Sequence, residues 1–264
     1  MSPKFLPLLE ETIKDYYENC SGLGQSEDAI PYLLPALIIA RRPKVVFEIG
    51  AYRGFSSFAM ASALKFNAEF EPLNFLKEGK SQVHPIKKFD KVKGKIFCLD
   101  PTLDPHFVRR LEKFPELKEY IQFIQKKSGE INLDEFEQID FLFIDGDHAY
   151  KSCRDDFLKF YPKISSGGLV IIHDYFPDAP IPEEPWWGPN LFSKQLREAF
   201  NFSDSIVIDT GFASLAIFRK KTDYIDYPFL STNYIKGFFH FLFHLPKRGV
   251  KFLGKRSLKI IGRY

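Results

Sequence analysis

The sequence predicts an α/β protein built on a doubly wound, mostly parallel sheet, and two features indicate this. Short apolar runs of strand length recur along the chain, and segments with helical apolar spacing fall between most of them. This alternation is typical of a parallel sheet that is covered by helices on both faces. A chain of 264 residues is long enough for one such domain with appendages.

The expected elements follow in chain order. Two helices, at residues 4–19 and 27–41, precede the first strand, and Pro43 ends the second of them. Seven strands are expected at 44–50, 95–100, 121–126, 139–145, 168–173, 205–209 and 214–219. Helices are expected between them at 55–66, 104–119, 150–163 and 189–200. Only a few residues separate the last two strands, so we expect an antiparallel hairpin at the end of the sheet, with an antiparallel last strand.

The chain is predicted to divide into three parts. Residues 1–43 form a helical cap, residues 44–221 carry the sheet, and residues 222–264 form a basic tail. Residues 67–94 are long, mixed and rich in Lys, and we interpret them as an insertion that forms a surface loop. The charge is uneven, because residues 234–264 contain eight Lys/Arg and no Asp/Glu.

The tail has the pattern of a basic amphipathic helix. Pro246 is suited to begin a helix, and lysines then recur every four residues, at Lys247, Lys251, Lys255 and Lys259. Such a helix fits an anionic membrane surface. The alternatives are a helix docked on the body or on a partner, and a disordered basic end. Nucleic-acid binding is disfavoured because the body is mildly acidic and contains no known motif.

A cytoplasmic location is expected. The three cysteines, Cys20, Cys98 and Cys153, are scattered and form neither a disulfide framework nor a metal-type spacing. The N-terminal segment lacks the apolar core and cleavage site of a signal peptide, and no apolar run reaches membrane-spanning length. Binding of the tail to lipid would place the protein at the inner face of the membrane.

The first strand ends in a candidate cofactor turn. Gly50 and Gly54 bracket a tight turn into a helix, where free N–H groups attract anionic groups and Ser56 adds a hydroxyl. Glu48 could accept hydrogen bonds from an amine. The alternative is an ordinary strand–turn–helix connection. The spacing is not the GxGxxG of dinucleotide-binding proteins, which weakens a nicotinamide interpretation.

Acidic residues end three further strands. Asp100 follows the second strand, where an acidic side chain commonly binds a ribose. Asp145 and Asp174 end strands that we expect to be neighbours, and two converging carboxylates favour a divalent cation such as Mg²⁺. The alternative is a pair of helix caps, a role that we assign to Asp147. His148 is a candidate base or a hydrogen-bonding loop residue, and His173 is expected to be structural.

Four segments together resemble the class I, S-adenosylmethionine-dependent methyltransferases. These segments are EIGAYRGFSS at 48–57, DFLFIDGDHAY at 140–150, GGLVIIHDY at 167–175 and SLAIFRK at 214–220. The resemblance covers roughly residues 25–220 and is strongest to O-methyltransferases of the catechol type and of the macrolide-sugar type. It implies a Rossmann-like fold and S-adenosylmethionine (SAM) as cofactor.

The resemblance also assigns roles to residues. It implies that Gly50, Tyr52 and Ser56 contact the methionine part of SAM, that Asp100 binds its ribose and that Ser128 lies beside its adenine. Glu48, Gly54 and Asp145 complete the cofactor-binding set, Asp145 and Asp174 are the metal ligands, and His148 is the catalytic base. Two positions depart from the family, since Lys127 replaces an acidic residue and Tyr175 replaces the Asn of catechol-type enzymes.

The predicted function is therefore SAM-dependent O-methylation, with Mg²⁺ as a candidate assistant. The expected acceptor is a hydroxyl of a sugar, a glycan or a small secondary metabolite, contacted by Trp186, Trp187 and Tyr175. The two tryptophans could alternatively fix their loop to the body. Two other functions remain open, an NAD(P)-dependent oxidoreductase and a non-catalytic cofactor-binding protein. A homo-oligomer is also left open.

Overall fold

The computed structural model describes residues 5–20, 29–70, 91–175, 187–199, 205–209 and 214–220. Several expectations therefore lie outside the described residues. They concern Trp186, most of the predicted insertion, the loop before the last helix and the basic tail.

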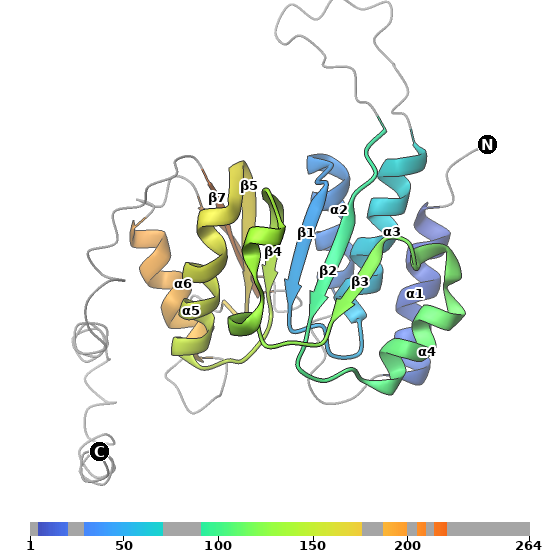
Figure 1. The fold of residues 1–264 in the computed structure, drawn as a ribbon, viewed down its shortest axis with the longest axis horizontal. Coiled ribbons are helices and arrows are strands. Elements are labelled where there is room, and N and C mark those ends of the chain that lie inside the picture. The colour runs from blue at the N-terminus through green and yellow to red at the C-terminus, as the bar shows by residue number, and fades with distance from the viewer. Residues whose placement is uncertain are drawn as a thin grey trace, which may run out of the picture.

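The structure contains the predicted seven-stranded sheet, with strand order β3-β2-β1-β4-β5-β7-β6 (Figure 1). Every neighbouring pair is parallel except the two pairs that include β7, which is antiparallel to both β5 and β6. The predicted antiparallel hairpin at the end of the sheet is thereby confirmed. The strands are β1 (Val45–Ile49), β2 (Lys95–Leu99), β3 (Ile121–Ile124), β4 (Ile139–Ile144), β5 (Ile164–His173), β6 (Ser205–Asp209) and β7 (Ser214–Arg219).

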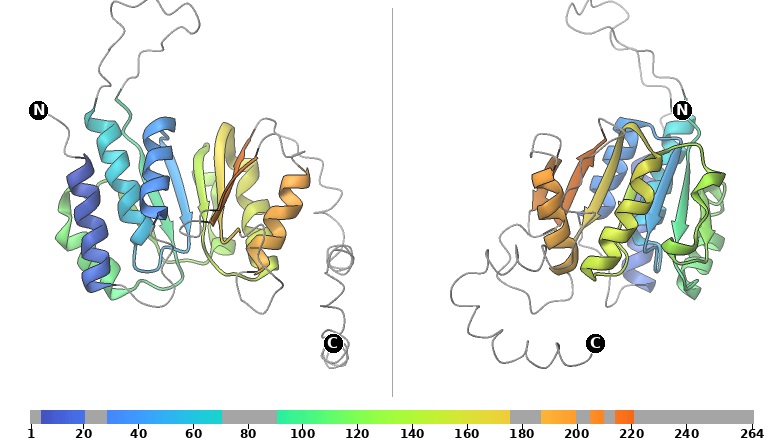
Figure 2. Two further views of the ribbon diagram at one scale, coloured as in Figure 1. Left: turned by 180° about the vertical axis from the view of Figure 1, so that it is seen from behind. Right: turned by 60° about the vertical axis from the view of Figure 1, so that its left-hand side comes forward.

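Helices cover both faces of the sheet, as Figure 2 shows. One apolar core joins the sheet to helices α2, α3 and α4, and a second core joins the opposite face to α5 and α6. Helix α1 packs on the outer side of α3 through a third cluster. Two cores are possible because alternate strand residues point to opposite faces. The helices are α1 (Phe5–Asn19), α2 (Ile30–Arg41), α3 (Phe55–Glu69), α4 (Pro105–Lys113), α5 (Tyr150–Phe160) and α6 (Trp187–Ala199).

Several predicted boundaries were wrong. The helix predicted at 104–119 ends at Lys113, and a separate 3₁₀ turn begins at Pro115, because proline cannot continue the hydrogen bonding of a helix. Helix α3 continues to Glu69, three residues beyond its predicted end at residue 66. Asn67 is fully buried there, and its side-chain amide donates to the Ile38 carbonyl at 2.9 Å.

Two more boundaries differ around the fourth connection. Helix α5 ends at Phe160, and a 3₁₀ turn over Tyr161–Lys163 replaces its predicted last residues. Strand β5 begins at Ile164 rather than at residue 168, and its pairing with β4 shifts register there. No described helix is long and apolar enough to span a bilayer.

The carboxyl ends of β1 and β4 come together at a single glycine. Strand β1 lies between β2 and β4. Strands β2 and β3 follow on one side of it and β4 and β5 on the other, so the strand order reverses at β1, which is the topological switch point of the sheet. Gly50 has a φ of 92°, and a Cβ atom on it would lie 2.0 Å from the carbonyl oxygen of Asp145. The two strand ends can approach this closely only because residue 50 has no side chain.

Candidate active site

A cavity of about 1230 Å³ opens at the carboxyl ends of β1, β2, β4 and β5. Its volume exceeds that of a typical site for one drug-sized ligand, so it has room for a cofactor and an acceptor. The predicted site residues that line it are Gly50, Tyr52, Ser56, Asp100, Ser128, Asp145, His148 and Asp174. The sheet therefore brings together residues that are far apart in the sequence.

The glycine turn forms one wall of the cavity. Tyr52 has a φ of 42° and Gly54 a φ of 81°, so two residues of the turn adopt the left-handed conformation. Gly54 is the N-cap of α3, whose first N–H groups have no partner within the helix. The predicted turn therefore presents the positive end of α3 at the edge of the sheet.

Glu48 does not line this cavity, contrary to the prediction that it binds the cofactor. The pleat of β1 points its side chain toward α3, where it is fully buried and accepts hydrogen bonds from the hydroxyls of Ser56 and Ser57. Burial raises the pKa of Glu48 to about 7. Glu48 thus anchors the first turn of α3 from below. The hydroxyl of Ser56 is committed to that contact, although Ser56 itself lines the cavity.

Asp100 is held rigidly at the end of β2. Its Oδ2 accepts the N–H of Tyr52 at 2.9 Å, and its Oδ1 accepts the N–H of Thr102 at the same distance. The carboxylate is therefore fixed against the glycine turn, with lone pairs left for a diol. This is the position that the sequence predicted for a ribose-binding residue.

Ser128 lies at the next wall of the cavity, after β3. Its hydroxyl donates to Oδ1 of Asp156, which is on α5 and also lines the cavity. Burial raises the pKa of Asp156 to about 6. The sequence analysis missed Asp156, yet it contained a signal. Asp156 lies three residues after Cys153 and four before Phe160, on the apolar face of its helix.

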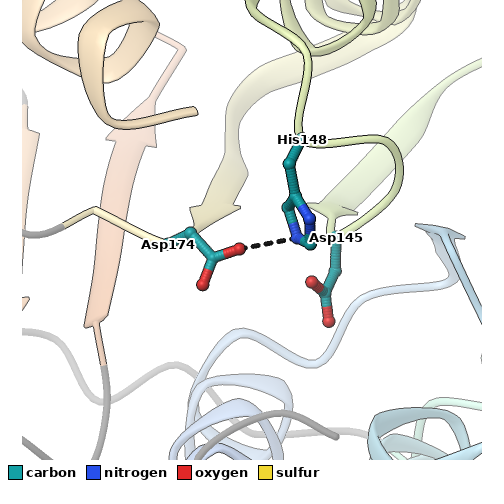
Figure 3. Close-up of side chains that lie close together, drawn as sticks. All are labelled: Asp145, His148 and Asp174. Atoms are coloured by element: carbon teal, nitrogen blue, oxygen red, sulfur yellow. Dashed lines mark ion pairs between the residues drawn. The ribbon is translucent and has the colours of Figure 1, made fainter. Parts of the chain in front are cut away.

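Asp145, His148 and Asp174, which follow β4 and β5, converge in the cavity lining (Figure 3). Nε2 of His148 lies 2.8 Å from Oδ2 of Asp174. One potential ligand atom from each of the three residues lies within 4.8 Å of the other two, as in a metal site. Asp174 has a φ of 58°, so the backbone adopts a left-handed conformation where it delivers this carboxylate.

His173 ties the two carboxylates together from behind. Its Nδ1 lies 2.9 Å from Oδ1 of Asp145 and 3.3 Å from Oδ1 of Asp174. The side chain is 7% exposed, in agreement with the predicted structural role. Asp147 accepts the N–H of Ala149 at 3.2 Å and the hydroxyl of Ser152 at 2.6 Å, but it is not the predicted helix cap, because the N-cap of α5 is Ala149.

The protonation of this cluster favours a paired imidazole and carboxylate. The hydrogen bond with Asp174 raises the pKa of His148. Burial opposes ionisation of Asp174, but its hydrogen bonds with His148 and His173 outweigh burial and hold its pKa well below the usual range. An ionised Asp174 orients the ring through Nε2–H and leaves the lone pair of Nδ1 on neutral His148 to accept a proton.

Tyr175 does not line the cavity, so its predicted contact with an acceptor does not fit the structure. It is 2% exposed and packs in the core with α6, where its hydroxyl accepts a hydrogen bond from Arg197 at 2.8 Å. Trp187 is the first residue of α6, and its side chain is outside the described part of the structure.

The sequence analysis also missed a buried arginine behind the glycine turn. Arg110 of α4 is fully buried and donates to the carbonyls of Gly54 at 2.7 Å and Thr12 at 2.7 Å, and to Oδ2 of Asp15 at 3.1 Å. It thereby links the turn to α1. Tyr16 of the same helix lines the cavity. Neither contact follows from local pattern, because each joins distant segments.

Comparison with known proteins identifies the same region. Residues 47–175 match the family model described as a methyltransferase domain. Among curated proteins, an uncharacterized protein of Acanthamoeba polyphaga mimivirus is 46% identical over 37 residues, which are 14% of this chain and 17% of that protein. The chain therefore spans less than a fifth of that relative.

Solved structures share the fold. The O-methyltransferase TomG from Streptomyces achromogenes, in complex with SAM, has a TM-score of 0.55 at 15% identity, over 81% of this chain and 90% of that one. An O-methyltransferase from Bacillus cereus, in complex with SAH, has a TM-score of 0.52 at 15% identity, over 81% and 91%. The SAH-bound methyltransferase of Podospora anserina has a TM-score of 0.51 at 17% identity, over 84% and 89%.

Proposed function

We propose that residues 47–175, which match a methyltransferase domain, form the catalytic domain of a class I, SAM-dependent methyltransferase, and that the protein transfers the methyl group to a hydroxyl oxygen with His148 as the base. One observation carries this proposal. His148 and Asp174 form a 2.8 Å imidazole–carboxylate pair in the same cavity as the glycine turn and Asp100. A base and a cofactor turn facing one space are the two parts that methyl transfer to oxygen requires.

The cofactor is proposed to extend along the glycine turn and the end of β2. Gly50, Tyr52 and the backbone of Ser56 would hold its methionine end at the start of α3, where Gly54 shapes the turn without lining the cavity, and Asp100 would accept hydrogen bonds from its ribose hydroxyls. Ser128 then marks the adenine end. Asp145 closes the cavity beside the reacting carbon. SAM supplies a methyl group that is already activated by the sulfonium charge.

The residues of this chain supply alignment and removal of a proton. His148 accepts the hydroxyl proton of the acceptor at Nδ1, while Asp174 fixes the ring through Nε2 and stabilises the imidazolium that forms. Bound SAM would supply the methyl carbon to the acceptor oxygen, its carbon–sulfur bond breaking as the oxygen–carbon bond forms, and would depart as S-adenosylhomocysteine (SAH).

A divalent cation is proposed to assist at Asp145 and Asp174. The donor set fits such an ion, because two carboxylates converge and the imidazole of His148 completes a group of three potential ligands. Mg²⁺ prefers carboxylate and water oxygens, which would leave His148 free as base. A bound cation would lower the pKa of the acceptor hydroxyl. This arrangement does not require the Asn that Tyr175 replaces.

The acceptor is proposed to be a hydroxyl of a sugar, a glycan or a small secondary metabolite. Support comes from an imidazole base, which matches the macrolide-sugar type of resemblance, and from TomG, which is involved in tomaymycin synthesis. Trp186 and Trp187 are proposed to stack on the acceptor. The 234–264 segment is further proposed to hold the protein on anionic lipid. Its deletion should release the protein from anionic vesicles and should not change how much of it sediments with neutral vesicles.

The first test is calorimetric titration of SAH into wild type, Asp100→Ala and Asp134→Ala. Asp134 is 88% exposed and serves as a control for loss of an acidic side chain. We expect micromolar binding to wild type and control and about 10- to 100-fold weaker binding to Asp100→Ala, because two ribose hydroxyls lose their acceptor. Absence of SAH binding to wild type would overturn the cofactor assignment.

The second test measures turnover on a panel of glycan and small-molecule hydroxyl acceptors, with Mg²⁺ and with EDTA. His148→Gln should lower kcat by about 100- to 10,000-fold without weakening SAH binding. The same change at His106, which does not line the cavity, should leave kcat unaltered. Equal turnover of His148→Gln and wild type would exclude His148 as base. SAH binding without turnover on any acceptor would favour a non-catalytic binding protein.

A further inference from the structure

Asp156 is a buried carboxylate in the part of the cavity where the proposed function places the adenine ring of the cofactor. It is 8% exposed and lies on the apolar face of α5, between the buried side chains of Cys153 and Phe160. It nevertheless lines the cavity together with Ser128. A buried carboxylate is costly unless it receives hydrogen bonds, so its partners are informative.

Only one of its two oxygens has a partner among the described residues. Oδ1 accepts the hydroxyl of Ser128, and no described basic side chain forms an ion pair with Asp156. Lys159, the nearby cation on the same helix, donates instead to the Gly129 carbonyl at 2.6 Å. Oδ2 lies near Gly146, since it is 3.9 Å from the position of a Cβ built there. The free oxygen is therefore next to the loop after β4.

The position of Asp156 relative to Asp100 defines what Oδ2 could meet. Asp100 follows β2, Ser128 follows β3, and Gly146 follows β4, and all three line the same cavity. If Asp100 holds the ribose, the base attached to that ribose extends toward Ser128 and Asp156. Position 127, where the family resemblance implies an acidic residue, is a lysine. The described cavity wall thus needs another acceptor for the adenine amino group.

We propose that Asp156, held by Ser128, accepts the N6 amino group of the cofactor's adenine and makes the site select adenosyl over inosyl cofactors. This assignment rests on the proposed function. Adenine presents an amino donor at the position where hypoxanthine presents a carbonyl oxygen. A carboxylate pairs with the donor and repels the carbonyl. Burial raises the pKa of Asp156 to about 6, so the carboxylate is ionised at pH 8.

The test is calorimetric titration of SAH and its hypoxanthine analogue, S-inosylhomocysteine, at pH 8 into three proteins. These are wild type, Asp156→Asn and Asp155→Asn. Asp155 is the adjacent residue on α5, lines the same cavity and pairs with Lys151 and Arg154, so it controls for removal of one negative charge from the cavity wall. The ratio of the two dissociation constants is the measured quantity.

Wild type and Asp155→Asn should prefer SAH by about 10- to 100-fold, because hypoxanthine leaves the carboxylate without a donor. Asp156→Asn should lose most of this preference, since its amide can donate to the hypoxanthine carbonyl. An unchanged ratio in Asp156→Asn, even with weaker binding of both ligands, would assign Asp156 a structural role and overturn the proposal. Failure of wild type to bind either ligand would instead overturn the proposed function.

Discussion

Two groups of charged side chains, one behind the glycine turn and one at the edge of the cofactor cavity, differ in how completely they are paired. The first, which we name the closed cluster, consists of Asp15, Arg109, Arg110 and Lys113. The second, the open cluster, consists of Asp145, His148, His173 and Asp174. In the closed cluster three cations surround one carboxylate that is 1% exposed. In the open cluster two carboxylates share two imidazoles at the edge of a cavity.

Pairing in the closed cluster is internal. Burial alone would raise the pKa of Asp15, but its hydrogen bond with Lys113 and the charge of Arg110 outweigh burial and lower it. Burial lowers the pKa of Arg110 to about 10, so the guanidinium stays charged at neutral pH. The donors of Arg110 go to Asp15 and to backbone carbonyls of α1 and the glycine turn. Nothing in this cluster faces a ligand.

The open cluster keeps its carboxylates directed at the cavity, where a cation or a substrate hydroxyl can use them. The comparison teaches that charge alone does not mark a catalytic group in this protein. The closed cluster should act on stability and on the shape of the glycine turn, whereas the open cluster should act on turnover.

The largest effect is expected from Arg110→Met. This change leaves Asp15 buried beside weaker partners and frees the carbonyl of Gly54, so the free energy of unfolding should fall by about 3–5 kcal/mol. Urea denaturation followed by circular dichroism measures this loss. A variant within about 1 kcal/mol of wild type would show that the cluster does not support the fold.

Glu48→Gln tests a third buried charge, which lies beneath the glycine turn. The pKa of Glu48 is raised to about 7, so the folded state favours the neutral carboxyl. Its contribution to stability is complete below its ordinary pKa of 4.5 and is lost as the pH rises through 7. Between pH 4.5 and pH 8, wild type should lose about 3 kcal/mol relative to Glu48→Gln. If the difference in the free energy of unfolding between wild type and Glu48→Gln does not change across this pH range, the raised pKa of Glu48 is refuted.

Asp145→Asn should show the opposite pattern to Arg110→Met. Its carboxylate faces the cavity, so neutralising it should change the free energy of unfolding by less than about 1 kcal/mol. Turnover should fall by about 100-fold or more, because Asp145 is a proposed ligand beside the reacting atoms. Paired assays of stability and kcat make the comparison. A large loss of stability with normal kcat would place Asp145 with the closed cluster.

The smallest effect is expected from Arg109→Met, the same replacement one residue earlier. Arg109 is 41% exposed and contacts Asp15 at 3.3 Å from the outside of the closed cluster. An exposed arm of this kind contributes about 0.2–1 kcal/mol, and high salt should reduce that contribution further. Equal destabilisation by Arg109→Met and Arg110→Met would show that burial does not determine how much each ion pair with Asp15 contributes to stability.

The fold was predictable because its signals are local. Apolar runs, prolines and glycines marked all seven strands, and the tight turn between Gly50 and Gly54 was expected from the residue types alone. Predicted element boundaries were wrong where a single residue overrides the apolar periodicity, as Pro115 does at the end of α4. Asn67, by contrast, is polar in sequence but belongs to a buried helix face, because a backbone carbonyl of α2 receives its amide.

The site was predictable where a side chain follows a strand end, and less so where strand pleat or tertiary contact decides. Asp100, Asp145, His148 and Asp174 reach the cavity because parallel strands end together. Glu48 does not, because its position in the pleat of β1 turns it to the opposite side. The contacts of Arg110 and Asp156 join segments with no local signal of their proximity.

The buried guanidinium also sets an order in time. Gly54 receives its hydrogen bond from a residue 56 positions later in the chain, and Thr12 receives one from a residue 98 positions later. During synthesis, the first helix and the turn therefore leave the ribosome well before their common partner does. Contacts of such sequence separation close slowly compared with a helix. A nascent chain that stops short of α4 holds every residue of the turn and still lacks the bonds that fix its shape.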